Sequence, residues 1–176
     1  MNFKEYKIVM RERLMRYFDV EEDYYFGGDY IDLFASSNIR NEKYFAVKNI
    51  KIWGFENNEY CLIKHFDKRI DIGIVKDYQG LLKDAISKFV NPHDEHMSSI
   101  ITGVMAVECF VPEDVLNTVT GFKYSRSFCF GFKGWCDLRL ILVDLINNKV
   151  YGNKKAKEVM GFYLPERGNK SIERMV

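Results

Sequence analysis

The stretch that most constrains the fold is Tyr124–Ile146, which carries the strongest β-strand pattern in the chain. Its first half alternates phenylalanines with smaller residues, and from Leu138 onward it is apolar at nearly every position. A strand that is apolar at both odd and even positions is covered on both faces rather than half exposed to water. Gly131–Gly134 supplies a turn at the centre. The stretch therefore predicts a hairpin inside a sheet, with other layers above and below it.

Two cysteines are predicted to face each other across this hairpin. A loop of two or four residues within Gly131–Gly134 gives one register, in which Cys129 lies opposite Cys136. Directly opposed Cβ atoms are about 4.5–5.5 Å apart, whereas a disulfide prefers about 3.8 Å. We expect two neighbouring buried thiols without a disulfide or a metal between them.

The composition indicates one domain with a large core. Of its 176 residues 47% are hydrophobic and 15% aromatic, and a chain of this length buries about 70% of its unfolded surface. The net charge of +1 argues against a dedicated nucleic-acid binder. The chain has no run of 18 apolar residues, and its start reads as a helix opening rather than an export signal. We expect a cytoplasmic protein with reduced cysteines, no membrane segment and a loose tail after residue 165.

Three helices are predicted before residue 124, and a further short helix capped by Asn153 is expected through Met160. The first covers residues 2–18 and opens on a capping box formed by Asn2 and Glu5. The second and clearest covers residues 72–90, where apolar residues hold the helical period without a miss. A short third helix follows Pro112, which suits the start of a helix.

The strands give the fold class. A strand is expected at Tyr30–Ser36, followed by a polar connection, then a hairpin at Tyr44–Phe66 and a long strand at Ser98–Phe110. The predicted order is αβββαβαββ. We expect an α+β domain with a mixed, mainly antiparallel sheet on which the helices pack.

The hairpin at Tyr44–Phe66 contains a possible acidic pair. A turn at Asn57-Asn58 places Glu56 opposite Glu59. Like charges that face each other are unfavourable. The pair must therefore lie at an exposed tip or bind a metal, and the tip is favoured because no third ligand is nearby in the sequence.

The first six predicted elements, over residues 2–110, resemble in order the αβββαβ core of restriction-endonuclease-like nucleases. That resemblance implies an acid on the second core strand and Glu-x-Lys or Asp-x-Lys on the third, which hold Mg²⁺ and position water. Asp32 is the candidate for the first acid, although it lies on the first predicted strand. Glu59 begins the third strand, but Cys61 occupies the position of the lysine. The defining motif is therefore missing.

Histidines supply the densest set of metal-ligand types. His93 and His96 are spaced to bind one metal if both rings point the same way, with His65 as a third ligand. They follow an Asn-Pro pair, however, and are expected in a loop. We expect neither a metal nor another cofactor.

Motifs for nucleophilic catalysis or nucleotide binding are absent from the sequence. It has no G-x-S-x-G, P-loop or G-x-G-x-x-G pattern. The basic run Lys154–Lys157 has two readings, a phosphate contact or a solvated helix surface, and the second is favoured.

The whole chain is similar to an uncharacterised family of prokaryotic single-domain proteins. The resemblance rests on the phrases at residues 41–45, 96–99 and 133–137 and implies no activity. The leading hypothesis is a non-enzymatic binding or interaction module, because catalytic motifs are lacking and aromatic residues suit an interface. A divergent nuclease-like or metal-dependent hydrolase is the alternative. We expect a homodimer, with a protein or small molecule as a further partner.

Overall fold

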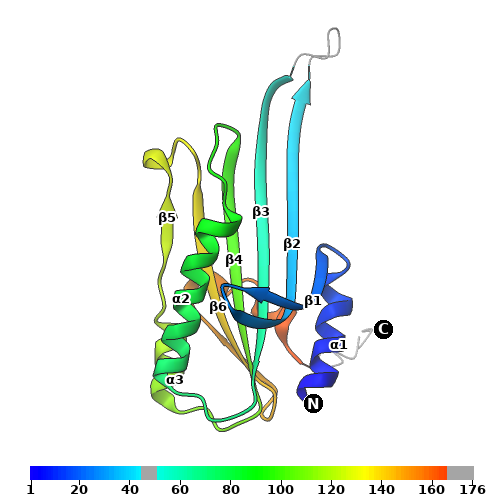
Figure 1. The fold of residues 1–176 in the computed structure, drawn as a ribbon, viewed down its shortest axis with the longest axis vertical. Helices are drawn as coiled ribbons and strands as arrows, with labels where there is room; N and C mark the ends of the chain where they lie inside the picture. The colour runs from blue at the N-terminus through cyan, green and yellow to red at the C-terminus, as the bar shows by residue number, and fades with distance from the viewer. Residues whose placement is uncertain (45–50, 166–176) are drawn as a thin grey trace, which may run out of the picture.

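The computed structural model describes the backbone of residues 1–44 and 51–165, and the side chains of residues 1–38 and 57–165. It is an α+β fold in which helices pack on a seven-stranded mixed sheet (Figure 1). The predicted fold class is confirmed. The tail after residue 165 lies outside the described residues.

The sheet has the strand order β1-β2-β3-β4-β6-β5, and β7 pairs with β6. Two pairs are parallel, β3 with β4 and β4 with β6, and the remaining pairs are antiparallel. β2 and β3 extend past the helices as a two-stranded ribbon (Figure 1). The strands are β1 (Asp19–Phe26), β2 (Asp29–Tyr44), β3 (Lys51–Phe66), β4 (His96–Val107), β5 (Ser125–Ser127), β6 (Trp135–Asp144) and β7 (Lys149–Gly152).

One face of the sheet is covered by α1 (Phe3–Leu14). The predicted capping box is confirmed: the Asn2 side chain accepts from the Glu5 N–H, and the Glu5 carboxylate accepts from the Asn2 N–H. The helix ends four residues earlier than predicted, because the chain must turn to begin β1 at Asp19. The side chains that α1 buries are Phe3, Tyr6, Met10 and Leu14.

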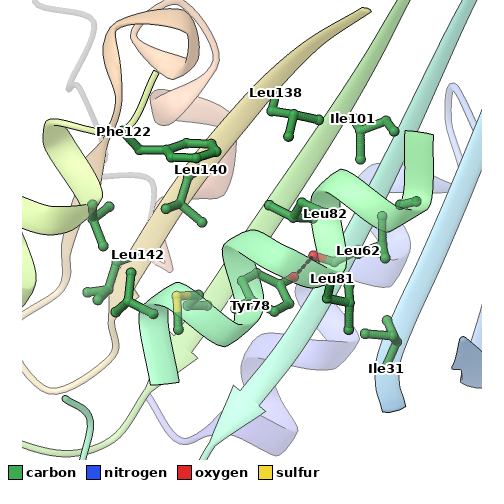
Figure 2. Packing of buried hydrophobic residues seen from close by; sticks show 14 of the residues in the cluster. Ile31, Leu62, Tyr78, Leu81, Leu82, Ile101, Phe122, Leu138, Leu140 and Leu142 are labelled. Carbon is green, nitrogen blue, oxygen red and sulfur yellow. Dashed lines mark hydrogen bonds between the residues drawn. The ribbon is translucent and has the colours of Figure 1, made fainter. Parts of the chain in front are cut away.

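The opposite face is covered by α2 (Ile72–Phe89) and α3 (Glu113–Thr120), which confirms both helix predictions (Figure 2). The buried hydroxyl of Tyr78 donates to the Leu62 carbonyl at 2.7 Å. α2 approaches the sheet closely at Gly103, where an added Cβ would lie 2.4 Å from a methyl carbon of Leu82. A side chain at this position of β4 would therefore displace the Leu82 side chain from its place in the core.

The three strands before α2 are not the three that were predicted, although their number is right. No element was predicted between the helix at residues 2–18 and the strand at Tyr30–Ser36, but this segment forms β1, an edge strand that exposes its charged side chains. Charged residues are well tolerated at an edge because one side of the strand remains open to water. β2 also continues through residues 36–41, which were expected as a connection.

The predicted turn at Asn57-Asn58 is wrong. β3 runs without interruption through both residues and lies between β2 and β4. The side-chain oxygen of Asn58 accepts from the Asn38 amide across the β2–β3 pair at 2.5 Å. This hydrogen bond gives the half-enclosed amides a partner across the strands, so turn-forming residues can remain within a strand. Glu56 consequently pairs with Arg40 in the backbone register, and the predicted Glu56–Glu59 pair does not form.

The predicted register between Cys129 and Cys136 is also wrong. β5 has only three residues, and its Arg126 pairs with Cys136. The shift of three residues reverses the faces, so Cys136 is buried whereas Cys129 is exposed in the turn, and both thiols are free. The second half of Tyr124–Ile146 does follow the prediction, because most side chains of β6 are buried.

Candidate interaction surface

Asp32 and His65 come together, but through the backbone of the histidine. The Asp32 carboxylate accepts from the His65 N–H at 2.7 Å. The His65 ring stacks on Phe3 with centroids 4.1 Å apart, and its Nε2 lies 2.9 Å from the Glu108 carboxylate at an angle unsuited to a hydrogen bond. Sequence reasoning missed Glu108, which reaches His65 only because β3 and β4 are parallel neighbours.

Glu59 lies apart from this cluster. It precedes His65 by six residues on β3, a separation of about 20 Å along a strand. Its carboxylate is instead 3.7 Å from Arg139. Cys61, at the position of the expected lysine, is fully enclosed, and burial raises the pKa of its thiol to about 12. Asp32, Glu59 and His65 therefore do not converge on one point.

The added strand β1 changes the position of Asp32 in the fold. Asp32 lies on the second strand, β2, rather than on the first strand as predicted. This is the strand that the nuclease-like resemblance assigns to the first acid. Among the described residues, no group of three or more histidine, cysteine, aspartate or glutamate side chains is placed to hold a metal.

His93 and His96 have separate environments. His96 is the first residue of β4 rather than part of the loop, and both of its ring nitrogens have partners: Nδ1 lies 2.7 Å from the Lys133 carbonyl oxygen and Nε2 lies 2.9 Å from the Ser99 hydroxyl. His93 precedes β4, and its Nδ1 accepts from the Glu95 N–H. His96 thus connects β4 to the β5–β6 turn instead of pointing toward a shared ligand.

The turn that His96 contacts lies between β5 and β6 (Figure 1). It carries the exposed aromatic side chains Phe130 and Phe132. Phe130 is fully exposed, at 101%, and Phe132 is 87% exposed. Trp135 at the start of β6 and Met97 at the start of β4 are about two-fifths exposed. We call Met97, Phe130, Phe132 and Trp135 the aromatic tip.

The backbone beneath the aromatic tip has a defined and unusual shape. Cys129 and Phe130 adopt positive φ angles of 47° and 54°, which residues other than glycine rarely take. The Phe128 carbonyl accepts from the N–H groups of Gly131 and Lys133, and the Phe128 N–H donates to the Gly134 carbonyl. The turn therefore displays its phenylalanines on a hydrogen-bonded backbone rather than on a strand.

Charged side chains of both signs lie beside the aromatic tip. The Arg126 guanidinium lies over the Phe128 ring, 5.4 Å from its centroid. The Lys133 ammonium is 3.8 Å from the Asp94 carboxylate, which is almost fully exposed. We call Asp94, Arg126 and Lys133 the rim of the aromatic tip. The rim offers both cations and an anion to a contacting surface.

Sequence reasoning found the residues of the tip but misread their setting. The alternation of Phe128, Phe130 and Phe132 suggested a buried strand. The signal against that reading was the pair Gly131 and Gly134, which both take positive φ and confine the phenylalanines to a turn.

The fold and its surface define an α+β domain with helices on both sheet faces and a protruding aromatic tip. The chain belongs to the family described as a domain of unknown function, DUF8052, whose model matches residues 2–165. No curated protein and no solved structure matches the chain. In the described residues, no helix is both long and apolar enough to span a membrane.

Proposed function

We propose that this protein is a non-enzymatic interaction module that associates with a second copy of itself through the aromatic tip. The observation that carries the proposal is the complete exposure of Phe130 on a backbone with positive φ. Both the exposed ring and the backbone conformation cost free energy in the isolated chain. A contact that covers the ring recovers part of that cost.

The rim charges favour a second copy as the occupant. In a two-fold arrangement the same surface meets itself, so a rim of one sign would repel its partner. Here the rim carries the acidic Asp94 as well as Arg126 and Lys133, and Lys133 of one copy can approach Asp94 of the other. The net charge of +1 adds little long-range repulsion.

The size of the tip sets the expected strength of association. Aromatic side chains bury about 150–250 Å² each when covered, so the tip offers about 500 Å² per copy. Two copies then bury about 1,000 Å², which is at the low end for specific interfaces. We therefore expect a weak dimer that dissociates on dilution in the micromolar range.

Sedimentation equilibrium tests the proposal. The wild type should approach twice the 20.8 kDa mass of the chain as its concentration rises. The double variant Phe130→Ser/Phe132→Ser should remain monomeric, whereas Phe110→Ser should dimerise like the wild type. Phe110 is a suitable control because its side chain is 83% exposed but lies just beyond the C-terminal end of β4, whereas the aromatic tip lies near the N-terminal end of that strand.

Two outcomes would overturn the proposal. One is a wild type that stays monomeric at several hundred micromolar. The other is a dimer that survives in Phe130→Ser/Phe132→Ser. Circular dichroism of each variant checks that the fold is retained.

The alternative, a metal-dependent nuclease-like enzyme, has one observation in its favour, the place of Asp32 on the second strand. Against it stand the distance from Glu59 to His65 and the thiol of Cys61 at the lysine position. We expect no cleavage of plasmid DNA with Mg²⁺ or Mn²⁺. Metal-dependent cleavage that is lost in Asp32→Asn would establish the enzyme instead.

A further inference from the structure

A second surface feature, independent of the aromatic tip, is a cleft beside β5 and the segment that follows β7. Its volume is about 360 Å³, and its lining consists of Phe122, Lys123, Tyr124, Ser125, Lys154 and Lys155. A neighbouring hollow of about 450 Å³ shares Lys154 and Lys155. Cavities of this size suit small-molecule ligands.

The charge in this cleft is positive and only partly neutralised. Lys155 forms an ion pair with Asp137 at 2.8 Å, and Asp137 also accepts from the Ser125 hydroxyl. Within the part of the chain that the structure describes, no acidic side chain forms an ion pair with Lys123 or Lys154. Among the described side chains, the cleft thus holds two lysines without an acidic partner and a third that is held by Asp137.

A buried asparagine ties the two walls of the cleft together. Asn153 is 1% exposed, and its amide nitrogen donates to the carbonyls of Phe122 and Leu138. Its side-chain oxygen accepts from the N–H groups of Leu140 and Ala156. Phe122 belongs to one wall and the Lys154–Ala156 turn to the other, so Asn153 fixes the backbone positions from which the lysine side chains extend.

The nearby arginine is occupied with structural contacts. Arg139 donates through Nε to the Lys155 carbonyl, and its guanidinium lies close to Glu59. The cations that remain are lysines, which bind phosphate as point charges. A phosphate monoester carries about −1.5 to −2 charges near pH 7 and a carboxylate carries one, so a group of lysines favours the phosphate. Tyr124 adds a half-buried aromatic ring to the lining.

From these contacts we propose that the cleft binds a small organic phosphate. The ammonium groups of Lys123, Lys154 and Lys155 hold the phosphate, and the ring of Tyr124 contacts the organic group attached to it. This ligand site goes beyond the proposed self-association and does not depend on it, because none of its residues belongs to the aromatic tip.

Titration calorimetry with phenyl phosphate, inorganic phosphate and benzoate tests the site. Phenyl phosphate should bind more tightly than inorganic phosphate, and benzoate should bind at least about tenfold more weakly than phenyl phosphate. The variant Lys123→Gln/Lys154→Gln should lose at least about tenfold in affinity for phenyl phosphate. The matched control Lys149→Gln/Lys157→Gln removes the same charge outside the lining and should bind like the wild type.

Two further variants test the contact with the organic group and the independence of this site from the proposed self-association. Tyr124→Leu should abolish the advantage of phenyl phosphate over inorganic phosphate. Phe130→Ser/Phe132→Ser should bind phenyl phosphate as the wild type does, whatever its oligomeric state. Equal binding of benzoate and phenyl phosphate, an equal loss in both lysine pairs, or no binding by the wild type would each overturn the phosphate site.

Discussion

The Nδ1 atom of His96 lies 2.7 Å from the carbonyl oxygen of Lys133, which joins the start of β4 to the turn that carries the aromatic tip. A carbonyl oxygen can only accept, so Nδ1 carries the proton, and in the neutral ring Nε2 accepts from the Ser99 hydroxyl. His96 is 3% exposed. The shape of the tip therefore depends on a buried contact with a neighbouring strand.

Gly134 is expected to be the least replaceable residue of the turn. An added Cβ would lie 2.5 Å from the Met97 carbonyl oxygen and 2.7 Å from Nδ1 of His96, at a φ of +77°. Gly131 has a φ of +93° but open space around it. We expect Gly131→Ala to lower the free energy of unfolding by about 1–2 kcal/mol, and Gly134→Ala to lower it by at least about 1 kcal/mol more. Urea unfolding measures both, and equal losses would contradict the close packing at Gly134.

Leu82 and Gly103 should be energetically coupled. Leu82→Ala removes a fully buried side chain and is expected to cost about 2–5 kcal/mol. Gly103→Ala forces a methyl group against Leu82 and is expected to cost about 1–3 kcal/mol. The double variant should lose less than the sum, because the shortened residue 82 makes room for the added methyl. Additive losses in a thermal or urea double-mutant cycle would argue against this contact.

Cysteine alkylation should distinguish the two cysteines of the β5–β6 region. Cys129 is exposed, whereas burial raises the pKa of Cys136 and of Cys61 to about 12. At pH 8 almost none of either buried thiol is ionised, and the thiolate is the reactive form. We expect iodoacetamide to modify Cys129 first and the two buried thiols only after unfolding in urea. Mass spectrometry that found Cys136 modified as fast as Cys129 in the folded protein would contradict the observed register.

Asn153 should tolerate even an isosteric change poorly. In Asn153→Asp the carbonyls of Phe122 and Leu138 lose their donor and face a buried carboxylate. We expect the free energy of unfolding to fall by about 3 kcal/mol. Asn91→Asp, at an exposed position, should change it by less than about 0.5 kcal/mol. The two variants are compared by urea unfolding, and similar midpoints would contradict the structural role of Asn153.

Part of the candidate surface was visible in the sequence, but its exposure was not. The sequence predicts the turn at Gly131–Gly134, but its alternating pattern assigns Phe128 and Phe130 to a buried strand. That Phe130 and Phe132 point into water follows from the short β5 and from the contact of His96 with Lys133. Nothing in the sequence near His96 indicates a partner that lies 37 residues away. The lysines of the cleft could not be grouped from the sequence either. Lys123 and Lys154 line one cleft only in the folded chain, where Asn153 joins their two segments.

The sequence by itself determined the helices, and the tertiary structure alone decided the strand pairing. Each helix makes its hydrogen bonds between residues four apart, so the apolar period of α2 was sufficient to place it. A strand takes its partners from distant segments, and the same residues fit more than one register. Asn57-Asn58 reads as a turn until β2 and β4 lie on either side of it. The register of each strand pair depends on which side chains become buried beneath the helices on each face of the sheet. That burial is a property of the whole chain and not of any one segment.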